Sequence, residues 1–122
     1  MTVRTAAAIT ALVRVGIGAA FVAAPAPVTR LWTGPTGVDA PAARVLARGL
    51  GIRDLLIGLG LLDALRRGGT TRPWSWFAVA GGAVDVAATL AVARELPASR
   101  RAAAPLIAAT VVADAVIAAR LP

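Results

Sequence analysis

The sequence predicts an all-α fold, a bundle of four transmembrane helices with short loops. Of its 122 residues, 58% are hydrophobic and only 16% are charged, whereas about a quarter of a soluble domain is charged. The apolar residues form four long blocks, and each block has roughly the 20 residues that cross a bilayer. Trp32, Trp74 and Trp76 lie at or just beyond block ends, where interfacial aromatic residues gather. We therefore expect one integral membrane domain over residues 1–122.

The predicted spans cover residues 5–24, 45–65, 74–93 and 102–121. Arg4 and the first block resemble a signal peptide, but Arg14 interrupts the block, so we expect a retained first span. Pro25 ends that span because proline cannot continue a helix. The connection over residues 25–43 is rich in Pro and Gly, which predicts an ordered turn region on the membrane surface. Asp39 is the expected N-cap of the second helix, and Pro41 is expected in its first turn.

Composition excludes several kinds of chemistry. The chain has no Cys and no His, which rules out thiol nucleophiles, disulfides, thiolate metal sites and imidazole acid–base catalysis. We predict no metal site. The net charge of +7 favours anionic lipid headgroups as counterpart, and no nucleic acid, because no basic patch stands beside stacking aromatics. Arginines are divided almost equally between the two sides, so orientation stays open between a single orientation and dual topology.

Each predicted span carries formal charge near its centre: Arg14 in the first, Arg53 and Asp54 in the second, Asp85 in the third and Asp114 in the fourth. A charge at the bilayer centre costs about 2.5–3.5 kcal/mol even on insertion scales. We therefore expect these side chains to face the bundle interior and meet near the midplane. The set contains two positive and three negative charges. One carboxyl group is therefore expected to lack a cation of its own or to share a proton with another carboxyl group. These five residues are our candidates for a ligand-binding site or a proton relay.

Small residues flank these charges at spacings of four, three and four, which keep residues on one helix face. Small residues let membrane helices approach closely, so this face predicts a packing seam. The seam positions are Ala11, Gly18, Gly51, Gly58 and Gly82. The fourth span departs from the pattern, with Val111 at a matching position beside Asp114. An internal ion pair that only fixes helix register remains an alternative to a functional site.

Two short motifs carry a family resemblance. Arg14-x3-Gly18-x2-Phe21, followed by Pro25, resembles the opening of DoxX-like four-helix membrane proteins. The Arg-x2-Gly-x-Arg-Asp-x3-Gly pattern over residues 48–58 resembles a signature of small four-span proteins common in actinobacteria. The resemblance implies a four-helix bundle in the bacterial plasma (inner) membrane. It also permits a quinone-side partner, because some DoxX-like proteins are similar to subunits of quinone-linked redox systems.

Three functional hypotheses follow. The favoured one is a non-catalytic accessory subunit, or a binder of an apolar small molecule of lipid or quinone type, beside the charged cluster. Its partners would be the bilayer and a larger membrane protein or a second copy. No cofactor is predicted beyond the quinone that the resemblance permits.

The second hypothesis is a proton-coupled small transporter, because intramembrane carboxylates form proton relays. Against it, the only glutamate is Glu95, at a span end, and Arg14 occupies the first span. The third is a membrane-embedded isomerase or cyclase in which Asp85 or Asp114 acts as general acid. No motif demands such an enzyme, so we expect a protein without catalytic activity.

Overall fold

The computed structural model describes residues 1–121, and these form helices joined by turns, without a strand among them. The elements are α1 (Val3–Ala23), α2 (Pro25–Thr33), α3 (Pro41–Arg67), α4 (Arg72–Ala91), the 3₁₀ turn η1 (Ala98–Arg100) and α5 (Ala103–Arg120). The all-α prediction is confirmed.

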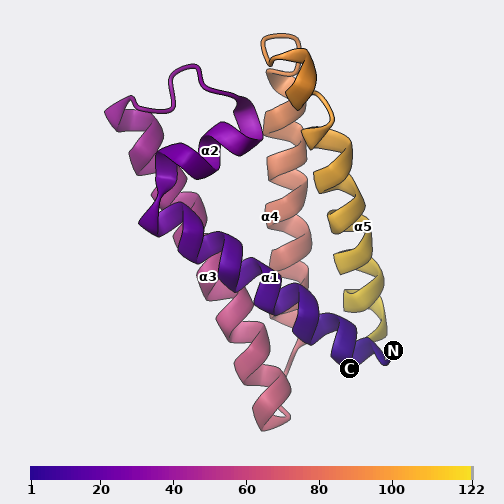
Figure 1. The fold of residues 1–122 in the computed structure, drawn as a ribbon. Helices are drawn as coiled ribbons and strands as arrows, with labels where there is room; N and C mark the ends of the chain where they lie inside the picture. Colours follow the sequence, from indigo (N-terminus) through magenta and orange to yellow (C-terminus); the bar gives the residue numbers. More distant parts are fainter. Residues whose placement is uncertain (122) are drawn as a thin grey trace.

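The helices pack as two antiparallel pairs. α1 packs most closely on α3, and α4 packs most closely on α5, with fewer contacts between the pairs. Both termini lie at the same end of the bundle as the turn between α3 and α4 (Figure 1). Helix α2 and the connection between α4 and α5 lie at the opposite end. The bundle therefore has a terminal end and an α2 end.

Three segments of the described chain are long and apolar enough to cross a membrane: Val3–Ala23, Arg72–Ala91 and Ala98–Arg120. The longest helix, α3, is not among them. Arg53, Asp54 and Asp63 interrupt the apolar stretch of α3, and these charged residues lower the mean hydropathy of the helix. Hydropathy thus supports three of the four predicted spans.

The connection between the first two long helices differs from the prediction. We expected turns over residues 25–43, but Pro25–Thr33 forms α2. Pro25 opens this helix, where its missing N–H costs nothing, and Gly34 ends it with a φ of +89°. The N-cap prediction for Asp39 is wrong, because Ala40 caps α3 without a side-chain hydrogen bond. The Asp39 carboxylate instead lies 3.5 Å from the Arg30 guanidinium.

The small residues of the predicted seam allow α1 and α3 to touch. A Cβ built on Gly18 would lie 2.6 Å from the Gly51 carbonyl oxygen, and one on Gly58 would lie 2.7 Å from the Ala11 carbonyl oxygen. Side chains at these positions would collide with backbone. Gly82 allows a different contact, between α4 and α5, since a Cβ built on it would lie 2.5 Å from Val111 Cγ2 of α5.

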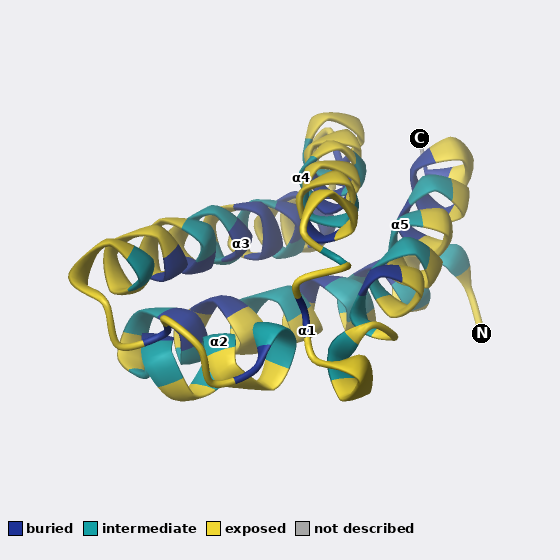
Figure 2. Cartoon of the chain, turned by 90° about the horizontal axis from the view of Figure 1, so that it is seen from above, coloured by how far each residue is buried: buried dark blue, intermediate teal, exposed yellow. Residues whose placement is uncertain are grey.

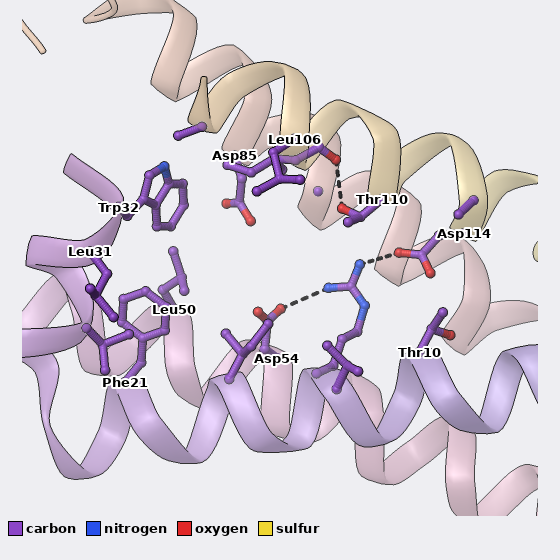
Figure 3. Close-up of a pocket in the computed structure, with 18 residues that line it drawn as sticks. Thr10, Phe21, Leu31, Trp32, Leu50, Asp54, Asp85, Leu106, Thr110 and Asp114 are labelled. Carbon is purple, nitrogen blue, oxygen red and sulfur yellow. Dashed lines mark hydrogen bonds and ion pairs between the residues drawn. The ribbon is translucent and has the colours of Figure 1, made fainter. Parts of the chain in front are cut away.

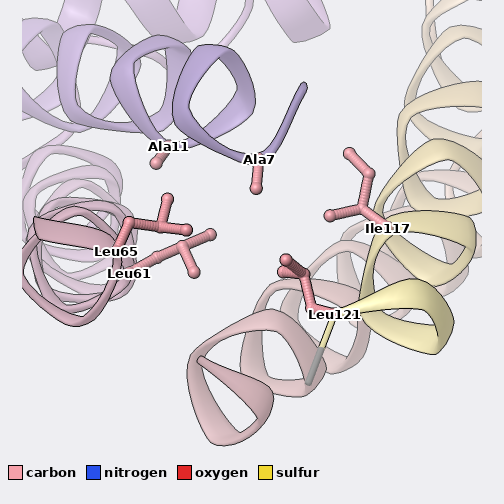
Figure 4. Close-up of a cluster of buried hydrophobic side chains, with 6 residues drawn as sticks. All are labelled: Ala7, Ala11, Leu61, Leu65, Ile117 and Leu121. Atoms are coloured by element: carbon pink, nitrogen blue, oxygen red, sulfur yellow. The ribbon is translucent and has the colours of Figure 1, made fainter. Parts of the chain in front are cut away.

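An apolar core fills the terminal end of the bundle (Figure 4). Its buried members come from α1, α3, α5 and the residue that follows α5: Ala7, Ala11, Leu61, Leu65, Ile117 and Leu121. Buried residues face inward along the long helices, and exposed ones face outward (Figure 2). Many outward residues are large and apolar, including Leu12, Leu46, Leu56, Phe77, Val84 and Val112. A surface of this kind suits contact with lipid or with another protein.

Candidate functional site

Arg14 of α1 lies at the centre of a buried ion-pair network. Its Nη1 donates to Asp54 Oδ1 of α3 at 3.2 Å, and its Nη2 donates to Asp114 Oδ2 of α5 at 2.5 Å. Nη2 also donates to the Ala78 carbonyl oxygen of α4 at 3.1 Å. The Arg14 side chain is only 13% exposed. One guanidinium therefore joins all four long helices.

Arg53 of α3 extends the network toward α4. Its Nη1 and Nη2 donate to the two carboxylate oxygens of Asp85 at 3.0 and 2.7 Å, a bidentate pair. Nη2 also lies 3.3 Å from Asp54 Oδ1. Arg53 Nε is buried without a hydrogen-bond partner in the described chain. Asp54 thus stands between two guanidinium groups.

The five predicted residues come together as one alternating chain of charges. Its order is Asp114, Arg14, Asp54, Arg53, Asp85. Alternation places each cation between two anions, which offsets the desolvation of buried charges. Both ends of the chain are carboxylates. The tertiary structure therefore confirms the predicted meeting of these side chains, and it adds the order in which they pair.

A cavity of about 630 Å³ lies against this network (Figure 3). Its walls are mostly apolar and come from all five α-helices, with Phe21, Leu31, Trp32, Leu50 and Leu106 among the lining residues. Arg14 and the three aspartates of the network also line it. The cavity is therefore an apolar space with one charged wall.

The rim of the cavity is apolar and open. Ile17, Leu31 and Leu106 line the cavity, yet they remain 45%, 70% and 69% exposed. They belong to α1, α2 and α5, so the opening faces sideways from the bundle. An apolar molecule could reach the network through this opening from the outer surface of the bundle.

Helix α2 closes part of the cavity. The Trp32 indole Nε1 donates to Thr89 Oγ1 of α4 at 3.2 Å, and the Trp32 ring meets the Phe21 ring edge to face at 6.1 Å. Thr89 Oγ1 in turn donates to the Asp85 backbone oxygen at 2.6 Å. These contacts hold α2 across the space between the two helix pairs. Sequence reasoning placed Trp32 at the interface and missed its place in a cavity wall.

Other charged residues remain outside the site. Asp63 pairs with Arg67 one turn later on α3, at 2.7 Å, and both side chains are mostly exposed. The described residues contain no group of three or more acidic side chains that could hold a metal ion.

Fold and site together define a class: an all-helical protein with a buried Arg–Asp network beside an apolar cavity. Comparison with protein-family models, with curated proteins and with solved structures finds no match for the chain. The resemblance to DoxX-like proteins therefore stays a prediction, and the functional argument rests on the site.

Proposed function

We propose that this chain is a four-span protein of a bacterial plasma membrane, with α3 as the fourth span. The burial of its central charges supports this assignment. Asp54 is buried, and Arg53 donates to two aspartates, so neither charge needs to meet lipid. Asp63 and Arg67 lie near the end of α3, where long polar side chains reach the headgroups. The outward apolar residues of the other helices would then contact acyl chains.

Cysteine labelling tests this topology, because the chain has no natural cysteine. Thr36→Cys lies in the turn before α3, and Thr70→Cys lies in the turn after it; both positions are exposed. If α3 crosses the bilayer and every molecule has the same orientation, a membrane-impermeant maleimide added to intact cells labels only one of the two cysteine variants. Permeabilised cells label both and serve as the control. Labelling of both from the outside to the full extent would contradict the fourth span.

We further propose that the protein binds an apolar small molecule, of lipid or quinone type, in the cavity beside the charged network. The apolar cavity with one charged wall is the observation that carries this function. Its volume of about 630 Å³ lies within the roughly 300–1,000 Å³ of typical ligand sites. The sideways opening suits a ligand that arrives through the bilayer.

Filling the cavity tests the binding function. Leu50→Trp adds a ring to the α3 wall, and we expect at least a tenfold loss of any apolar molecule that the protein retains, about 1.4 kcal/mol. Leu56→Trp is the matched control, because Leu56 is 60% exposed on the same helix and does not line the cavity. Both variants are purified in mild detergent beside the unaltered protein. Small molecules are then extracted and identified by mass spectrometry.

Retention of one defined molecule by the unaltered protein and by Leu56→Trp, with its loss in Leu50→Trp, would support the proposal. Equal retention by all three would contradict it, since the molecule would then sit on the outer surface. A larger protein recovered in equal amount, with no small molecule, would support the accessory-subunit role instead.

A further inference from the structure

We infer that the cavity selects an apolar molecule with a cationic, hydrogen-donating head, such as a long-chain amine. This inference rests on the proposed binding function and adds the charge of the ligand to it, which favours an amine over an uncharged quinone.

The charge balance favours a cation. The network contains two guanidinium groups and three carboxylates, so one negative charge is left when every group is ionised. Each guanidinium is already shared between two aspartates. A cationic head group in the cavity could pair with a carboxylate at one end of the network. The alternation of charges would then continue, and the net charge of the buried site would be zero.

Free acceptors remain on the most deeply buried carboxylates. Asp54 receives both of its hydrogen bonds on Oδ1, and Asp114 receives its single one on Oδ2. Asp54 Oδ2 and Asp114 Oδ1 accept no hydrogen bond within residues 1–121. The two side chains are 9% and 7% exposed. Because both residues line the cavity, these oxygens can accept hydrogen bonds from a group placed there, and an ammonium N–H would supply them.

The cavity meets the acidic side of the network. Asp54, Asp85 and Asp114 all line it (Figure 3), whereas Arg14 is the only lining arginine in the described part of the chain. Arg53 lies outside the lining, with its guanidinium against Gly81 and Asp85. The Arg14 Nη atoms are occupied by two carboxylates and a carbonyl. An anionic head would therefore face three carboxylates and find few free donors.

The test compares three ten-carbon amphiphiles that differ in their head group: decylamine, decanol and decanoate. Each compound competes with radiolabelled decanol for the protein, which is held in nanodiscs of zwitterionic lipid at pH 7. Empty nanodiscs measure how much of each compound partitions into the lipid, and this amount is subtracted. We expect decylamine to bind at least about tenfold more tightly than decanol, and decanoate to bind most weakly. This ranking is measured first on the unaltered chain, so it does not depend on the folding of a variant.

Two variants then locate the preference. Asp114→Asn removes the excess negative charge and leaves Arg14 paired with Asp54, so decylamine and decanol should bind about equally. Asp63→Asn removes the same charge from the exposed end of α3 and should keep the preference for the amine.

The outcomes separate the two proposals. Equal binding of decylamine and decanol to the unaltered chain, blocked by Leu50→Trp, would overturn the cationic selectivity and leave the binding function standing. Tighter binding of decanoate would overturn the selectivity as well. Absence of saturable decanol binding would overturn both proposals.

Discussion

Replacement of Arg14 by methionine is expected to lower the free energy of unfolding by about 3–5 kcal/mol, the cost of breaking a buried ion pair from one side. Among residues 1–121, the substitution removes the only cation that contacts Asp114, and it leaves three carboxylates with one guanidinium. It also removes the donor to the Ala78 carbonyl oxygen. Thermal unfolding in mild detergent, followed by circular dichroism, measures the effect against the unaltered protein.

Arg67→Met is the matched control for this prediction. It breaks an ion pair of similar length with Asp63, but its side chain is 79% exposed, so we expect a change within about 1 kcal/mol. A second variant that combines Arg14→Met with Asp114→Asn should recover part of the loss, because it removes an uncompensated carboxylate. Equal destabilisation by Arg14→Met and Arg67→Met would contradict a buried network.

Gly51→Ala is expected to destabilise the protein by about 1–3 kcal/mol, the usual cost of overpacking. A Cβ on Gly51 would lie 2.7 Å from the Gly18 carbonyl oxygen and 2.8 Å from Phe21 Cβ. Backbone cannot rotate away as a flexible side chain does, so α1 and α3 would have to separate. The separation would also move Arg14 away from Asp54. Unfolding in mild detergent measures the loss.

Gly49→Ala supplies the control on the same helix. A Cβ on Gly49 meets no atom within 4 Å, and alanine favours a helix over glycine by about 0.5–1 kcal/mol. We therefore expect this variant to be as stable as the unaltered protein or slightly more stable. The same contrast should hold for Gly18→Ala against Gly16→Ala on α1, since only Gly18 faces α3 closely. Similar losses for both members of each pair would exclude close helix contact.

Much of the architecture follows from local properties of the sequence. The apolar blocks set the four long helices, and Pro25 and Pro41 set a helix end and a helix start, because proline restricts the backbone wherever it stands. The cost of desolvation predicts that Arg14, Arg53, Asp54, Asp85 and Asp114 face inward. The spacing of small residues also identified the faces on which α1 and α3 touch.

Helix α2 shows why the rest required the tertiary structure. Its nine residues are too few to form a stable helix alone, and its Pro and Gly neighbours predict turns. Contacts of Trp32 with Phe21 and Thr89 hold it in place, and these partners lie on other helices. No local pattern in residues 25–43 contains that information.

The helical class, the apolar blocks and the identity of the inward charges could be predicted before folding is considered, since each depends on residue type and spacing within one segment. The folded arrangement was needed to show that Arg14 pairs with Asp54 and Asp114, that Arg53 pairs with Asp85, and that an apolar cavity remains beside them. Pairing depends on how far each helix is rotated and tilted against its neighbours. A cavity forms where the side chains of neighbouring helices do not fill the space between them, and this depends on how the helices pack.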